Sequence, residues 1–208
     1  MNWLKRLRTY YKTRHYKGFR AIDGWLTDAE AHTLYVLAGQ LPPKACVVEI
    51  GSWQGKSTCC LAKGLKDGTI HAIDPFDASG ETTSAKLYAE KSSQQQESLL
   101  GLFESNVAKN GIKDKIKLCQ GFSKDYAEAF EAIDLLFIDG DHSLEGCLYD
   151  FKTFAPKIKP GGFLLFHDYH PGRDDLGTNH VIEQNVRPSG DWQLVKQADS
   201  LIAFRKNV

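Results

Sequence analysis

Apolar residues recur at helical spacing in the N-terminal part of the chain and predict two helices there. The first falls in residues 2–16, where a stripe of aromatic residues and leucine is surrounded by basic residues. The second begins at Thr27, because Glu30 three residues later can complete a capping box. Pro42-Pro43 ends this helix, since proline cannot continue it.

After these helices, short apolar runs alternate with amphipathic segments. The runs predict strands over residues 46–50, 69–74, 116–120, 133–139 and 163–168. Helices are predicted near residues 55–65, 99–107, 123–131, 144–155 and 179–186. Two final strands, 192–197 and 200–205, are separated by a short turn and predict an antiparallel hairpin. This alternation indicates an α/β protein with right-handed crossovers and a doubly wound, mostly parallel sheet.

The ends of the predicted parallel strands are rich in acidic residues. In a doubly wound sheet, the ligand binds beyond the carboxyl ends of the strands. The residues at these ends are Glu49-Ile50-Gly51, Asp74, Gly121-Phe122-Ser123, Asp139 and His167-Asp168. Helix capping accounts for one or two of these carboxylates but not easily for all of them, so we expect a binding site at this edge.

A glycine-containing turn over residues 49–58 follows the first strand, and two nucleotide motifs resemble it incompletely. A P-loop has four residues between its first glycine and Gly-Lys, whereas only three separate Gly51 from Gly55-Lys56. A dinucleotide motif has a second glycine where this turn carries Trp53, whose side chain would obstruct a pyrophosphate. Both alternatives are therefore disfavoured.

The same turn also fits a third pattern, in which an acidic residue precedes two glycines spaced four apart. Glu49 at the start of the turn would face a cationic amino group. Asp74 ends the next strand and would take both hydroxyls of a ribose, because a carboxylate accepts several hydrogen bonds. The implied ligand has a ribose and an amino-acid end but no phosphate, which describes S-adenosylmethionine (SAM).

The chain carries three motifs in this order: residues 48–52 (VEIGS), residues 137–142 (FIDGDH) and His167-Asp168. Together they resemble the motifs of a known enzyme family. Over about residues 44–206 the chain resembles class I SAM-dependent methyltransferases, and more narrowly a small family related to macrolide, sugar and catechol-type O-methyltransferases. The resemblance implies a Rossmann-like sheet of seven strands with a reversed C-terminal hairpin. It also implies cofactor contacts by Glu49, Gly51, Ser52, Gly55, Ser57, Asp74 and Asp139, with Phe122 and Ser123 bracketing the adenine.

On the acceptor side, the related enzymes carry Asp-x-x-His, with the aspartate on magnesium and the histidine as base. Asp139 and His142 match this motif and are the expected catalytic pair. A hydroxyl acceptor must lose a proton, and histidine titrates near neutrality. The alternative is that the histidines only orient the strand ends.

The second acidic position of these relatives is replaced here. His167 and Asp168 stand where the relatives have two oxygen ligands, so the expected divalent-metal set is Asp139, His167 and Asp168. Magnesium prefers oxygen ligands, whereas a site with one histidine suits manganese or iron better. Whether a metal is bound stays open.

Composition adds limits to this interpretation. The chain has 208 residues, of which 42% are hydrophobic and 25% charged, as in one globular domain with a core. It contains neither an apolar run of the roughly 20 residues needed to span a bilayer nor the apolar stretch of a secretory signal. Five cysteines without C-x-x-C spacing indicate reduced thiols, so we expect a cytoplasmic protein.

The charges balance, with 26 basic and 26 acidic residues, but they are unevenly placed. Residues 1–22 carry seven basic residues and no acidic one, so the rest of the chain is acidic. An acidic body disfavours nucleic acid as a partner. The family resemblance implies a small hydroxylated metabolite or a sugar as the substrate. For the basic segment we favour packing on the protein, within or between subunits of a homo-oligomer, over peripheral contact with an anionic membrane.

We therefore expect a basic N-terminal arm and helix over residues 1–43 and a methyltransferase domain over 44–208. The polar segment 77–97 and the stretch 169–179 flank the expected acceptor side and are candidate lids. The rival to an enzyme is a protein that binds the cofactor without catalysis, or a module that docks on a partner. Such a protein needs Asp74 but not His142.

Overall fold

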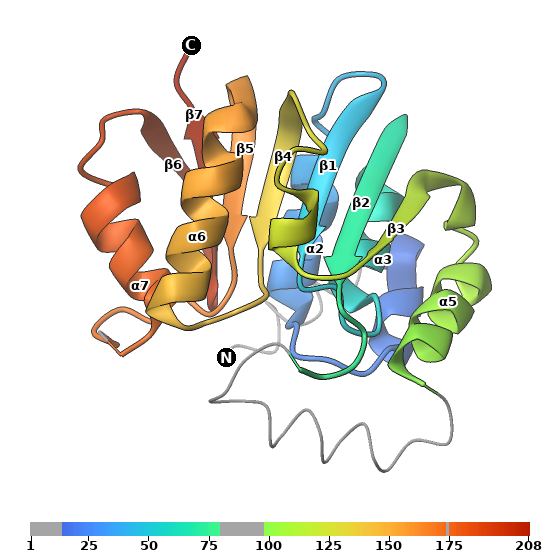
Figure 1. Cartoon of the computed structure of the whole chain (residues 1–208). Coiled ribbons are helices and arrows are strands. Elements are labelled where there is room, and N and C mark those ends of the chain that lie inside the picture. Colours follow the sequence, from blue (N-terminus) through green and yellow to red (C-terminus); the bar gives the residue numbers. More distant parts are fainter. Residues whose placement is uncertain (1–13, 80–97, 174) are drawn as a thin grey trace, which may run out of the picture.

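A computed structural model describes residues 14–79, 98–173 and 175–208, and its centre is a seven-stranded sheet (Figure 1). The strands are β1 (Ala45–Ile50), β2 (Gly68–Asp74), β3 (Ile116–Gln120), β4 (Ile133–Ile138), β5 (Ile158–Phe166), β6 (Trp192–Ala198) and β7 (Leu201–Lys206). Their order is β3-β2-β1-β4-β5-β7-β6. The first five are parallel, and β7 pairs antiparallel with both β5 and β6. The predicted doubly wound sheet with a reversed hairpin is confirmed.

Helices cover both faces of this sheet. They are α2 (Asp28–Ala38), α3 (Lys56–Gly64), α5 (Leu99–Lys109), α6 (Leu144–Phe154) and α7 (Gly177–Val181). Short 3₁₀ turns are η1 (Arg14–Ala21), η2 (Lys113–Lys115), η3 (Ser123–Tyr126) and η4 (Ala155–Lys157), and η5 (Ile182–Val186) is a π-helical turn that continues α7. Helices α6 and α7 lie in front of the sheet in Figure 1, and α2 and α3 lie behind it.

Two core layers result, because side chains alternate along each strand. On β4, Leu135 and Phe137 pack with α2, α3 and α5, whereas Leu136 and Ile138 pack with α6 and α7. All six residues of β4 are buried, as expected for a strand covered on both faces. Asp134 is the polar exception, and Lys159 Nζ lies 2.9 Å from its Oδ2.

The N-terminal helix α2 belongs to this same core. Its predicted capping box forms, since the Glu30 amide donates to Thr27 Oγ1 (3.3 Å) and the Thr27 amide donates to Glu30 Oε2 (2.8 Å). Phe19 from η1 and Leu34 from α2 are buried in the same core layer as Val47 of strand β1. The expected boundary near residue 43 thus falls between elements that share a core. Most of the predicted helix 2–16 and of segment 77–97 lies outside the described residues.

Two predicted elements differ from the structure. The helix expected over 123–131 is a single 3₁₀ turn, because the chain then turns inward to bury Phe130, whose ring packs edge-on against His71 at 4.9 Å between centroids. The strand expected over 163–168 begins earlier, at Ile158, and ends at Phe166. Within the described residues, no helix is long and apolar enough to cross a membrane.

Candidate functional site

A cavity of about 880 Å³ opens at the carboxyl ends of the parallel strands. This volume lies within the roughly 300–1,000 Å³ that is usual for small-molecule sites. Ten of the twelve expected site residues line it: Gly51, Ser52, Ser57, Asp74, Phe122, Ser123, Asp139, His142, His167 and Asp168. Glu49 and Gly55 are not among its lining residues.

The glycine turn after β1 is pressed against the end of β4. Gly51 adopts φ +88°, and a Cβ there would lie 2.2 Å from the carbonyl oxygen of Asp139. The Asp139 amide also donates to the Ile50 carbonyl at 2.9 Å. Gly55 adopts φ +86°, and a Cβ there would lie 3.1 Å from the Phe103 ring. Both glycines are therefore required by contacts within the protein, whatever ligand the cavity takes.

Glu49 lies beneath this turn and is completely buried. Its Oε2 accepts hydrogen bonds from Ser52 Oγ (2.9 Å) and Thr58 Oγ1, while Oε1 has no hydrogen-bond partner among the described residues. Burial raises the pKa of Glu49 to about 7, against the lowering effect of the Ser57, Thr58 and Ser52 hydroxyls. Glu49 therefore holds the turn through the hydroxyls of Ser52 and Thr58. Its expected contact with an amino group of the ligand stays a prediction.

Asp74 ends β2 and also organises the turn. Its Oδ2 accepts the amides of Ser52 (3.0 Å) and Trp53 (2.8 Å), and its Oδ1 accepts the amide of Phe76 (2.6 Å). Burial raises the pKa of Asp74, although these three amides lower it. A carboxylate has about four acceptor positions, so Asp74 retains acceptor capacity toward the cavity that it lines.

The lining of the cavity fits SAM. Carboxylates of Asp74, Asp139 and Asp168 suit a ligand that carries a cationic sulfonium and an ammonium group. Phe122 is 41% exposed at the cavity wall, where its ring can stack on a flat base. These features match a nucleoside with a cationic amino-acid end better than a polyphosphate.

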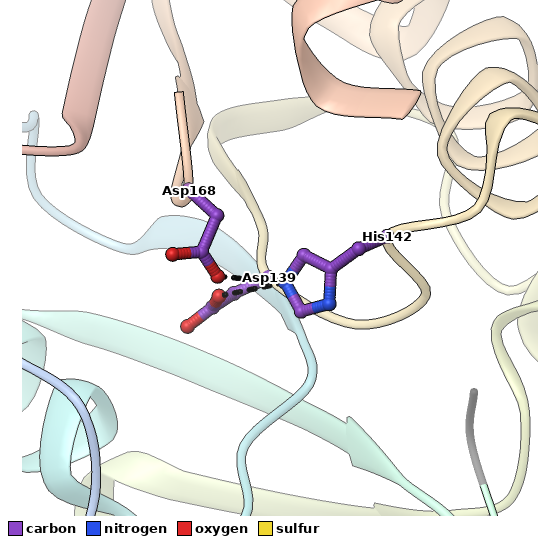
Figure 2. A group of neighbouring side chains, drawn as sticks. All are labelled: Asp139, His142 and Asp168. Carbon is purple, nitrogen blue, oxygen red and sulfur yellow. Dashed lines mark ion pairs between the residues drawn. The ribbon is translucent and has the colours of Figure 1, made fainter. Parts of the chain in front are cut away.

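On the acceptor side, Asp139 follows β4, Asp168 follows β5, and His142 reaches between them (Figure 2). Its Nε2 lies 3.0 Å from Asp168 Oδ2 and 3.7 Å from Asp139 Oδ1. The other ring nitrogen, Nδ1, points away from both carboxylates (Figure 2). Burial raises the pKa of Asp168, but hydrogen bonds from His142 and His167 outweigh this effect and hold the pKa well below its usual range.

His167 lies behind these carboxylates, with both ring nitrogens facing acidic groups. Nδ1 lies 3.3 Å from Asp139 Oδ1 and 3.4 Å from Asp168 Oδ2, and Nε2 lies 3.4 Å from Glu30 Oε2. Burial lowers its pKa, but the three carboxylates outweigh burial and raise the pKa well above the usual range. Ligand atoms of Asp139, His142 and Asp168 lie within 4.8 Å of one another, so this candidate metal group contains His142 where His167 was expected. The expected set with His167 stays a prediction.

Comparison with known proteins identifies the family of this chain. A family model described as a methyltransferase domain matches residues 48–169, more than half of the chain. The chain belongs to this methyltransferase family. Its sheet and helices are those of the class I SAM-dependent methyltransferases, as the motifs predicted.

The individual relatives of this chain are distant. It is 27% identical over 139 residues to an uncharacterized protein of Acanthamoeba polyphaga mimivirus, covering 61% of this chain and 52% of that protein, so it spans about half the length of that relative. The O-methyltransferase NovP has a TM-score of 0.69 at 15% identity, covering 98% of this chain and 99% of that one. TomG, an O-methyltransferase from Streptomyces achromogenes solved with SAM, has a TM-score of 0.63 at 16% identity over the full length of both chains.

Three residues at the candidate site had no role assigned from the sequence. Glu30 showed only its helix-capping pattern, and no local signal connects it with His167. Asp150 on α6 is buried at the cavity wall, and burial raises its pKa to about 7 against a lowering hydrogen bond from Ser123. His170 is half exposed, with Nε2 3.7 Å from Asp168 Oδ1, and its backbone amide donates to Asn179 Oδ1 at 3.0 Å. The position of His170 three residues after His167 was the one available signal.

Proposed function

We propose that this methyltransferase transfers the methyl group of SAM to a hydroxyl of a small polar metabolite or sugar, with His142 as the base. The observation that carries the proposal is the 3.0 Å contact between His142 Nε2 and Asp168 Oδ2 in the cavity that Asp74 also lines. When bound, SAM supplies an electrophilic methyl group attached to a sulfonium. Transfer of this methyl group leaves a neutral thioether. Alignment and proton removal are then the tasks of the protein.

Binding of the cofactor falls to the turn and to the strand ends. Asp74 holds the Ser52 and Trp53 amides and offers its remaining acceptor capacity to the ribose. Asp139 lines the same cavity and provides a negative charge opposite the cationic end of the cofactor. Phe122 and Ser123 form the wall for the adenine.

Removal of the proton falls to His142. With a proton on Nε2, which lies 3.0 Å from Asp168 Oδ2, the lone pair is on Nδ1, which would accept the proton of the acceptor hydroxyl. Asp168 then holds the ring in this tautomer and stabilises the imidazolium that forms, as an aspartate does beside a catalytic histidine. Asp139 contributes to the same field from 3.7 Å.

A divalent ion is the second candidate for this corner. The donor atoms of Asp139, His142 and Asp168 lie within 4.8 Å of one another, and two carboxylates with one imidazole suit Mn²⁺ better than Mg²⁺. In that case the Nε2 lone pair of His142 would bind the ion and Nδ1 would carry the proton. The two roles of His142 therefore exclude each other.

The test of the proposed function uses radiolabelled SAM and a panel of hydroxylated acceptors that includes sugars. We expect SAM binding by calorimetry and labelled methyl ethers from some of the acceptors. SAM binding without product from any acceptor would favour the rival, a cofactor-binding protein without catalysis. Binding of ATP in preference to SAM would favour a P-loop-like nucleotide enzyme.

A further inference from the structure

Glu30 on α2 connects three separate parts of the chain. Only 2% of the residue is exposed. Its Oε2 accepts the Thr27 amide at 2.8 Å, and its Oε1 accepts the Ser200 amide at 2.9 Å and Ser200 Oγ at 2.7 Å. Its Oε2 also lies 3.4 Å from His167 Nε2. Helix α2, the turn between β6 and β7, and the end of β5 thus meet at one carboxylate.

The opposite edge of the His167 ring faces the reactive corner. Nδ1 lies 3.3 Å from Asp139 Oδ1 and 3.4 Å from Asp168 Oδ2. Phe137 packs edge-on against the ring, with 6.5 Å between centroids and 84° between planes. The imidazole therefore has neighbours on both edges, with Glu30 Oε2 and Ser200 Oγ each 3.4 Å from Nε2.

We propose that Glu30 is a positioning residue for methyl transfer, which holds His167 so that the Nδ1 edge of its ring stays between Asp139 and Asp168. The inference rests on the proposed function, because Asp168 is the group that orients His142. Glu30 is not among the residues that line the cavity, so it acts through His167 and not on the substrate. Helix α2, which precedes the matched family segment, is then part of the active centre.

The negative charge of Glu30 is what distinguishes this role from helix capping. An amide at position 30 keeps an acceptor for Thr27 or Ser200, because both donors are neutral. An amide has a single oxygen, so it serves Thr27 or Ser200 but not both, and Glu30→Gln also removes the charge that faces His167 Nε2. After Glu30→Gln, the neighbouring carboxylates of Asp139 and Asp168 both lie at the Nδ1 edge of the ring, so the ring is expected to shift toward them.

The test compares Glu30→Gln with the wild-type protein. We expect the kcat for methyl transfer to fall about 10- to 100-fold, as is usual when a side chain that orients a ligating or catalytic group is changed. The Kd for SAM and the KM for the acceptor should stay within about threefold. In nitrogen NMR spectra, the ring ¹⁵N shifts of His167 should change, which a purely structural role for Glu30 would not cause.

Thr27→Ala is the matched control, because it removes the N-cap of the same helix but leaves the Glu30 carboxylate in place. It should lower Tm, because the helix loses its capping side chain, while kcat and the His167 shifts stay at wild-type values. If Glu30→Gln does not fold, Glu30→Asp replaces it, since it withdraws the charge from the ring by one methylene and should also lower kcat.

Wild-type kcat in Glu30→Gln with unchanged His167 shifts would overturn the inference, and so would an equal loss of kcat in Thr27→Ala. Failure of the proposed function looks different, because the wild-type protein itself would then transfer no methyl group. The His167 shifts would still decide in that case whether Glu30 holds the ring.

Discussion

His142 Nε2 lies 3.0 Å from Asp168 Oδ2, and this contact leaves the two ring nitrogens of His142 in different surroundings. Nε2 faces the carboxylates of Asp168 and Asp139, whereas Nδ1 points away from them (Figure 2). The tautomer of His142 therefore decides its chemistry. A proton on Nε2 makes the residue an oriented base, and a proton on Nδ1 makes it a metal ligand.

Replacement of His142 by alanine should lower kcat for a hydroxyl acceptor by about 10²- to 10⁴-fold, the usual contribution of a general base. The Kd for SAM should stay unchanged by calorimetry, because the turn and Asp74 remain intact. His180→Ala, at an exposed histidine, is the control and should have wild-type kcat. Unchanged turnover in His142→Ala would show that His142 is not the base and only orients the strand ends.

Removal of divalent ions distinguishes the two roles of His142. After dialysis against a chelator, we expect kcat to stay within about twofold of the untreated protein, because Nδ1 and Asp168 perform proton removal without an ion. The measurement is turnover before and after dialysis, with Mn²⁺ and Mg²⁺ added back separately. A loss of activity that Mn²⁺ restores would contradict the assignment of His142 as base.

Asp74→Ala should weaken SAM binding about 10- to 100-fold, because hydrogen bonds to a charged acceptor contribute about 1.5–3 kcal/mol. The free energy of unfolding should also fall, since the Ser52, Trp53 and Phe76 amides lose their shared acceptor. Calorimetry and urea unfolding measure the two effects. Asp77→Ala, at an exposed aspartate nearby, should change neither, and near-normal affinity in Asp74→Ala would remove the ribose assignment.

Glu49 should make the free energy of unfolding depend on pH. Burial raises its pKa from 4.5 to about 7, so the folded protein binds more protons than the unfolded chain between these values. The free energy of unfolding therefore falls as pH rises through this window, by up to about 3 kcal/mol, and stays lower above it.

In Glu49→Gln this contribution is absent. Relative to the variant, the wild-type protein should be more stable at pH 5 than at pH 8, as measured by urea unfolding at both values. Glu104→Gln, at an exposed glutamate on α5, is the control and should follow the wild-type profile. Parallel pH profiles of Glu49→Gln and wild type would show that the buried carboxyl does not titrate in this window.

Sequence patterns predicted the parts of the fold that local chemistry determines. The apolar run at 133–139 is a buried strand because both of its faces are covered, and Asp139 and Asp168 meet because parallel strands end at one edge. The helix expected near 123–131 was wrong, because the burial of Phe130 overrides local helical spacing. The place of Glu30 at the site could not be predicted, because its contact with His167 depends on how α2 packs and not on any motif.

The contact between Glu30 and Ser200 joins residues 170 positions apart in the chain. A ribosome makes the N-terminal part first, so α2 emerges long before the turn that completes its surroundings. Contacts of such long range are slow to form, because much of the chain must be ordered before they close. Until Ser200 is made, Glu30 and His167 both lack a neighbour, so this part of the proposed site is complete only after the turn between β6 and β7 has been synthesised.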